Sequence, residues 1–133
     1  MTLITDLELQ CVIDLATRIN TQIGSAGVIR FYDGTPPANV NLSPTGSTIV
    51  DCALSASALI TPTTPDLTFD TITDGTAGAP GTVTYARILD SSENAVMQFS
   101  VAESSAEITI DNATFATFDV CSVTELIVGV SFA

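Results

Sequence analysis

Residues 83–101, VTYARILDSSENAVMQFSV, decide the fold class of this 133-residue chain. The run alternates between two faces with a period of two as far as Leu89, which is the pattern of a β-strand. The polar residues 90–94 are typical of a short turn, and Met97, Phe99 and Val101 then share one face of a returning run. The sequence therefore predicts an antiparallel β-hairpin.

Further strands are predicted on both sides of this hairpin. Loops rich in proline and glycine separate them, above all residues 35–47 and 74–81. The expected strands cover residues 28–32, 48–54, 67–69, 106–110 and 123–132. The last of these is apolar on both faces, which predicts a position inside the sheet. Six or seven strands without β-α-β alternation favour a mainly β fold, a β-sandwich or barrel-like antiparallel domain.

One amphipathic helix precedes the strands. Thr5 and Glu8 have the spacing of a capping box, apolar residues then recur at helical intervals, and Gly24 offers a C-cap, so a helix is expected over residues 5–23. We expect a single domain over residues 1–133, with the helix in residues 1–24 and the β domain in residues 27–133. Leu3 and Ile4 are expected to staple onto the helix or, alternatively, to form an arm that reaches a partner.

The charge balance excludes several classes of partner. The chain has 15 acidic residues, three arginines, no lysine and no histidine, and its net charge is −12. Nucleic acid would be repelled, because binding it needs cations that replace counterions on phosphates. No apolar run reaches the 18 or more residues of a spanning helix, so no membrane insertion is expected. Residues 1–20 also lack the basic and apolar regions of a secretory signal.

The same composition argues against an enzyme and against a cofactor. Without histidine or lysine the chain lacks the commonest general base, the Schiff-base amine and the usual nitrogen ligand for metals. No ligand cluster and no glycine-rich phosphate loop indicates a metal or nucleotide site. A carbohydrate-binding or carbohydrate-active domain remains a remote alternative, and it predicts a cleft lined by at least two carboxylates and an aromatic platform.

Three cysteines and two arginines complete the candidate residues. Cys11, Cys52 and Cys121 match neither a CxxC motif nor a zinc pattern, and free, reduced thiols are predicted. Arg30 and Arg87 each interrupt an apolar strand, where an arginine serves either a structural ion pair or the recognition of a partner.

Residues 30–38, RFYDGTPPA, resemble the "IYDGTPPA" signature of a group of small tailed-phage structural proteins. The similarity continues through a helix that ends near Gly24 and Gly27, the segment TYARILDSS at residues 84–92 with the following Val96 and Met97, and a C-terminal strand rich in Val, Ser and Thr. The chain departs from this pattern in its three cysteines and in a more open loop after Ala38, which leaves the loop geometry open.

The resemblance implies a virion component with no catalytic residues, in which a capsid or a tail role is open. Combined with the acidic charge, it predicts a cement or decoration protein on the outer face of a phage capsid, assembled in the bacterial cytoplasm. The expected partners are the major capsid protein or other virion proteins and further copies of the chain, as a homotrimer. Leu3, Ile4, Arg30 and Arg87 are the candidate interface residues. A tail, baseplate or adhesin module is the alternative.

Overall fold

The computed structural model describes residues 4–123 and 126–130 and begins with the predicted helix, α1 (Thr5–Ile23). The expected capping box is wrong, because Ile4 occupies the N-cap position and no side chain caps the helix there. Gly24 ends the helix with φ 78°, a conformation that L side chains rarely adopt, and its N–H donates to the carbonyl of Asn20 at 3.0 Å.

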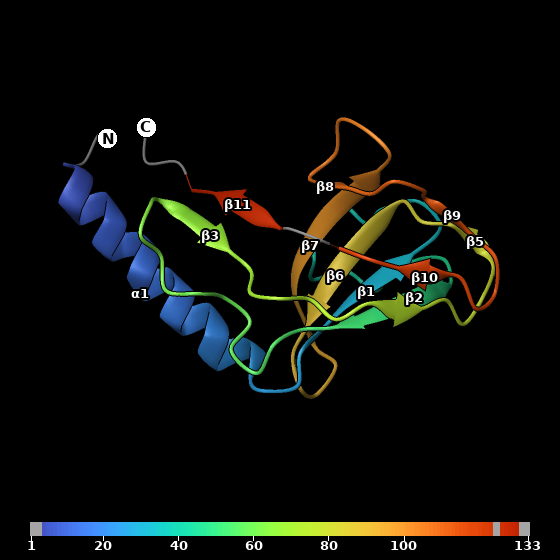
Figure 1. Cartoon of the computed structure of the whole chain (residues 1–133), viewed down its shortest axis with the longest axis horizontal. Coiled ribbons are helices and arrows are strands. Elements are labelled where there is room, and N and C mark those ends of the chain that lie inside the picture. The colour runs from blue at the N-terminus through green and yellow to red at the C-terminus, as the bar shows by residue number, and fades with distance from the viewer. Residues whose placement is uncertain (1–3, 124–125, 131–133) are drawn as a thin grey trace.

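A five-stranded sheet forms the body of the molecule (Figure 1). Its strands are β1 (Val28–Tyr32), β2 (Thr48–Ala53), β6 (Tyr85–Leu89), β7 (Ala95–Ala102) and β8 (Ile108–Thr109), in the order β2-β1-β6-β7-β8. All neighbours are antiparallel except the short β7–β8 pair. The hairpin expected from residues 83–101 is confirmed as β6 and β7. In its turn the Asp90 carboxylate accepts hydrogen bonds from the backbone N–H groups of Ser92 and Asn94.

Within the part of the chain that the structure describes, three two-stranded ribbons accompany this sheet in place of a second full sheet. They pair β3 (Asp66–Thr68) with β11 (Ile127–Gly129), β4 (Gly75–Thr76) with β10 (Val120–Cys121), and β5 (Gly81–Thr82) with β9 (Thr114–Phe115). The fold is therefore mainly β, with a curled, largely antiparallel sheet and one N-terminal helix, as the sequence predicts.

The expectation that the C-terminal run 123–132 lies inside the sheet is wrong for its described part. Of that run, β11 pairs only with β3, and Ile127 is 46% exposed. Leu126 and Val123 enter the core, whereas Val128 is half-buried against it. The run is apolar on both faces because it leaves the core and then forms a partly exposed ribbon. Residues 124–125 and 131–132 of this run lie outside the described residues.

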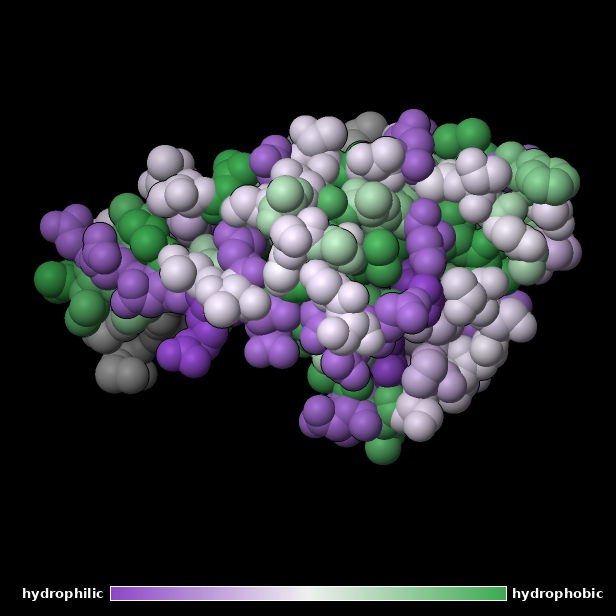
Figure 2. Space-filling model, turned by 90° about the horizontal axis from the view of Figure 1, so that it is seen from below, coloured by the Kyte–Doolittle hydropathy of each residue, from purple (hydrophilic) through white to green (hydrophobic). Residues whose placement is uncertain are grey.

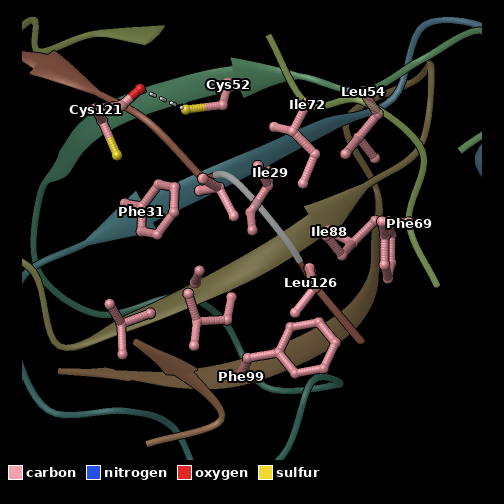
Figure 3. Close-up of a cluster of buried hydrophobic side chains, with 14 of the residues drawn as sticks. Ile29, Phe31, Cys52, Leu54, Phe69, Ile72, Ile88, Phe99, Cys121 and Leu126 are labelled. Atoms are coloured by element: carbon pink, nitrogen blue, oxygen red, sulfur yellow. Dashed lines mark hydrogen bonds between the residues drawn. The ribbon is translucent and has the colours of Figure 1, made fainter. Parts of the chain in front are cut away.

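The core lies between one face of the main sheet and the segments that cross it (Figure 3). Ile29, Phe31, Ile88 and Phe99 project from the sheet, and the residues that meet them are Phe69, Ile72, Cys121 and Leu126. Full burial of a side chain of this size contributes about 1.5–3 kcal/mol. The helix joins the same core through Val12, Ala16, Ile19 and Ile23.

Polar contacts fix the helix against the β domain. The Asn20 amide donates to the carbonyl of Leu59 at 3.0 Å and accepts from the Leu59 N–H at 2.8 Å, so one side chain mimics a strand partner. At the end of α1 the Ile23 carbonyl accepts from the backbone N–H and hydroxyl of Ser91. Figure 1 shows the result: α1 and β3 lie at one end of the molecule, and the β5–β9 and β4–β10 ribbons lie at the other.

Candidate partner interface

The two candidate arginines lie side by side on the face of the main sheet that is opposite the core. Arg30 on β1 is the antiparallel partner of Asp51 on β2 and of Arg87 on β6, and Arg87 is the partner of Gln98 on β7. The four residues form one row across four strands. Two like charges next to each other are unfavourable unless each finds its own partner. Each arginine turns to a different side for that partner.

Arg30 forms a surface ion pair. Its Nε and Nη2 atoms each donate to the Asp51 carboxylate at 2.8 Å, and Nη2 also donates to Glu93 in the β6–β7 turn at 2.8 Å. These hydrogen bonds, that to Asp51 above all, raise the pKa of Arg30 above its ordinary value. The three side chains are 22%, 40% and 70% exposed, so the contribution of the cluster to stability is about 0–1 kcal/mol per pair.

Arg87 is only 2% exposed and binds the loop of residues 33–47 through hydrogen bonds. Its Nε donates to the Gln98 amide oxygen at 3.0 Å, and its Nη2 donates to the carbonyl of Leu42 at 2.8 Å. Gln98 in turn donates to the carbonyl of Pro37 at 2.8 Å. Arg87 and Gln98 thus hold the proline-rich loop against the second face of the sheet.

The signature-like segment is the first half of this loop. Tyr85 fixes the second half, because its hydroxyl donates to the carbonyl of Thr45 at 2.6 Å and accepts from the Thr45 N–H at 2.8 Å. The Asp33 carboxylate accepts from the N–H of Ser47 at 2.5 Å and closes the loop. Gly46 has φ 75°, and a Cβ atom there would lie 2.0 Å from the Asp33 carbonyl. Asp33 and Gly46 therefore have structural roles.

Large apolar side chains are exposed mainly at the end of the molecule that carries α1. We call this set the helical end: Ile4 (74% exposed), Leu7, Leu15, Ile60 and Ile127. Figure 2 shows green, hydrophobic side chains at this end. Ile4 does not form the expected staple, since its side chain projects into solvent, and Leu3 lies outside the described residues. Between Thr5 and Cys11 no helix residue is fully buried, and only Glu8, Leu9 and Cys11 are half-buried, so the first turns of α1 are incompletely covered within the described residues.

A second exposed apolar group lies at the opposite end, in a turn that the sequence reasoning missed. Phe118 is 81% exposed and Val120 is 64% exposed. We call residues 116–120 the distal turn. The only signal in the sequence is a phenylalanine placed between threonine and aspartate in a polar stretch, and that signal does not separate an exposed aromatic side chain from a buried one.

A cavity of about 390 Å³ adjoins the distal turn. Asp111, Asn112, Asp119 and Ser122 supply polar atoms to its wall, and Phe115 and Val120 are among its apolar residues. The two carboxylates that a carbohydrate cleft requires are present. Phe115, however, is only 6% exposed and offers no free ring face, and one Asp119 oxygen accepts from the N–H of Ala116 at 2.8 Å.

Two of the three cysteines meet in the core. Cys52 on β2 lies against β10, with its Sγ 3.6 Å from the Cys121 carbonyl oxygen, as Figure 3 shows. A hydrogen bond with Cys52, together with burial, raises the pKa of the Cys121 thiol. Buried thiols with a raised pKa are poor nucleophiles. Cys11 is half-buried on α1, away from this pair.

Two further features concern the described residues 4–123 and 126–130. They contain no group of three or more acidic, histidine or cysteine side chains arranged to hold a metal ion. Their one helix, Thr5–Ile23, carries too many charged residues to cross a bilayer. Comparisons of the chain with protein-family models, with curated proteins and with solved structures found no match.

Proposed function

We propose that the chain is a structural protein of a tailed-phage virion, a decoration protein that binds the outer face of the capsid as a homotrimer and stabilises contacts between major capsid subunits. The observation that carries the proposal is the helical end. A folded domain with a net charge of −12 leaves several large apolar side chains uncovered there. Contiguous exposed apolar surface is typical of protein interfaces.

The resemblance to small phage structural proteins supports the choice of partner. Its most specific residues, Asp33 to Ala38, belong to a loop that Arg87, Gln98 and Tyr85 hold in place, which suits a rigid binding module. In a trimer the first turns of three α1 helices would cover one another, which gives them the packing partner that an amphipathic helix needs. Ile4 belongs to this surface, and Leu3 precedes it in the chain.

The charge supports an exterior position. Of three arginines, Arg30 and Arg87 are already engaged in hydrogen bonds with protein groups, so few cations remain for phosphates. Binding to the capsid then depends on apolar burial and on repetition across the trimer. We expect no shift of duplex DNA in gels. We also expect most of the protein to stay on capsid shells at about 1 M salt, where the Debye length is about 3 Å.

Three measurements test the proposal. Electron microscopy of intact virions separates a capsid from a tail position, and density on the tail alone would exclude decoration. Light scattering of the purified chain gives its oligomeric state. The Leu7→Glu variant should dissociate the trimer, whereas Leu42→Glu, which changes an equally exposed residue in the loop of residues 33–47, should not. A DNA shift, or full release from shells at high salt, would contradict the exterior, apolar mode of binding.

The cavity beside the distal turn favours a second candidate, an adhesin or carbohydrate-binding module. Its two carboxylates, Asp111 and Asp119, could accept hydrogen bonds from sugar hydroxyls. Titration with oligosaccharides of the host surface, using wild type and Asp111→Asn, tests this function. A loss of binding in the variant supports it, and no binding to wild type excludes it.

A further inference from the structure

We propose that Phe118 is a preorganised anchor that inserts into an apolar socket with a basic rim on a neighbouring virion protein. The proposal rests on the proposed function only for the class of partner. It concerns the distal turn, at the end of the molecule opposite the helical end (Figure 1).

Four hydrogen bonds hold the turn. The N–H of Asp119 donates to the Ala116 carbonyl at 3.0 Å, and the Asp119 carboxylate accepts from the Ala116 N–H at 2.8 Å. On the other side, the N–H of Phe118 donates to the carbonyl of Ala77 at 2.8 Å, and the N–H of Ala77 donates to the Asp119 carbonyl at 2.8 Å. Ala77 is 1% exposed, so the turn is attached to the core. The position of the Phe118 backbone is therefore fixed.

The conformation of Phe118 is unfavourable for its residue type. Its φ is 75°, in the left-handed region, which glycine tolerates and a bulky aromatic residue rarely adopts. Packing of the phenyl ring against the described residues does little to offset this cost, because Phe118 is 81% exposed. Strained residues of this kind persist where the surrounding structure determines them, and they concentrate at binding sites. Because the backbone is already fixed, only the two side-chain torsions of Phe118 lose freedom when it binds.

The surroundings indicate the chemistry of the socket. Val120, 64% exposed, adds an apolar contact beside the ring. Asp111 and Asp119 line the adjoining cavity, whereas the three arginines lie elsewhere, on α1, β1 and β6. An apolar anchor with an acidic border is complementary to an apolar pocket bordered by lysine or arginine. A second copy of this chain would meet the anchor with the same acidic groups, which disfavours self-association here.

A pair of substitutions separates binding from folding. Phe118→Gly suits the left-handed backbone, so its melting temperature should equal or exceed that of wild type, while its affinity for purified capsid shells should fall at least tenfold. Phe118→Ala should lose affinity to a similar extent. Leu42→Ala, which removes another exposed side chain, should bind as wild type does. A large fall in melting temperature for Phe118→Gly would overturn the proposal, and so would unchanged affinity if the shells bind the wild-type protein and crosslinking finds no tail partner.

Photo-crosslinking identifies the partner without assuming that it is the capsid. A photoreactive phenylalanine analogue is placed at position 118, or at position 42 as the control, in chains assembled into virions, and crosslinked peptides are sequenced. We expect a product from position 118 alone, on a peptide with apolar residues next to lysine or arginine. If that peptide belongs to a tail protein, the proposal for Phe118 is supported and the proposed position on the capsid is wrong. A product with a second copy of this chain, or no product, would refute the anchor itself.

Discussion

Removing either of the two neighbouring arginines tests whether burial or ion-pair count governs the stability of the sheet. Arg30 makes two ion pairs, with Asp51 and Glu93, and Arg87 makes none among the described residues. A count of ion pairs therefore predicts that Arg30 matters more. Burial predicts the opposite order, since Arg87 is 2% exposed and the Arg30 side chain is 22% exposed.

The magnitudes follow from the contacts. Arg87→Met keeps the length of the side chain but removes the hydrogen bonds to Gln98 and Leu42, and each bond to a charged group contributes about 1.5–3 kcal/mol. Part of this loss is offset, because the variant no longer desolvates a guanidinium. We expect a decrease of about 2–4 kcal/mol in the free energy of unfolding. Arg30→Met removes two exposed pairs, each of which contributes about 0–1 kcal/mol, so it should cost less than Arg87→Met.

Urea unfolding of both variants measures these free energies, and limited chymotrypsin digestion gives a local readout. Loss of the Arg87 contact should expose the peptide bond after Leu42 to cleavage under native conditions, whereas Arg30→Met should leave it protected. The reasoning is refuted if Arg30→Met costs as much as Arg87→Met, or if the loop of residues 33–47 stays protected without Arg87.

Three more predictions concern the core, the thiols and the turn. Leu126→Asp should lower the free energy of unfolding by about 3–5 kcal/mol, because Leu126 is buried in the core. Val128→Asp should lower it by only about 1–2 kcal/mol, because Val128 is half-buried in a ribbon. Equal losses in urea unfolding would contradict this. In native protein a thiol reagent should modify Cys11 first, and it should reach the two buried thiols only on unfolding. Titration of denatured protein should find three thiols, whereas finding one would show a disulfide. Hydrogen bonds from Asn94 and Ser92 lower the pKa of Asp90. The ionised Asp90 carboxylate therefore stabilises the fold above about pH 4, and this stabilisation is lost as the pH falls through the lowered pKa. Thermal melts at several pH values should show that Asp90→Asn loses less stability on acidification than wild type does.

Local patterns predicted the regular elements well. The helix over residues 5–23, the strand at 28–32 and the hairpin of β6 and β7 follow from periodicity and turn chemistry, which act between near neighbours. The capping box failed because Thr5 and Glu8 have the required spacing, but the helix begins at Thr5 itself, one residue earlier than a cap at Thr5 requires. Spacing alone does not determine which residue adopts the extended conformation of a cap.

The candidate interface depended on contacts that sequence does not contain. Nothing near Arg87 in the chain indicates that Leu42, 45 residues away, accepts its hydrogen bond. The distal turn was missed for a related reason, since the left-handed backbone of Phe118 results from hydrogen bonds to Ala77 on another segment. The ribbon of β11 was misplaced because a run with two apolar faces fits both a central strand and a strand that leaves the core.

The paired tyrosines give this protein an internal optical reporter. Tyr32 and Tyr85 are the two tyrosines of a chain without tryptophan, and their rings stack with centroids 4.9 Å apart and planes 10° apart. Near-ultraviolet circular dichroism and intrinsic fluorescence therefore report mainly on this pair. Because the Tyr85 hydroxyl is bonded to Thr45, release of the loop of residues 33–47 should change these spectra before the backbone signal of the sheet changes. Spectroscopy without any added label can thus follow loop release and global unfolding as separate events.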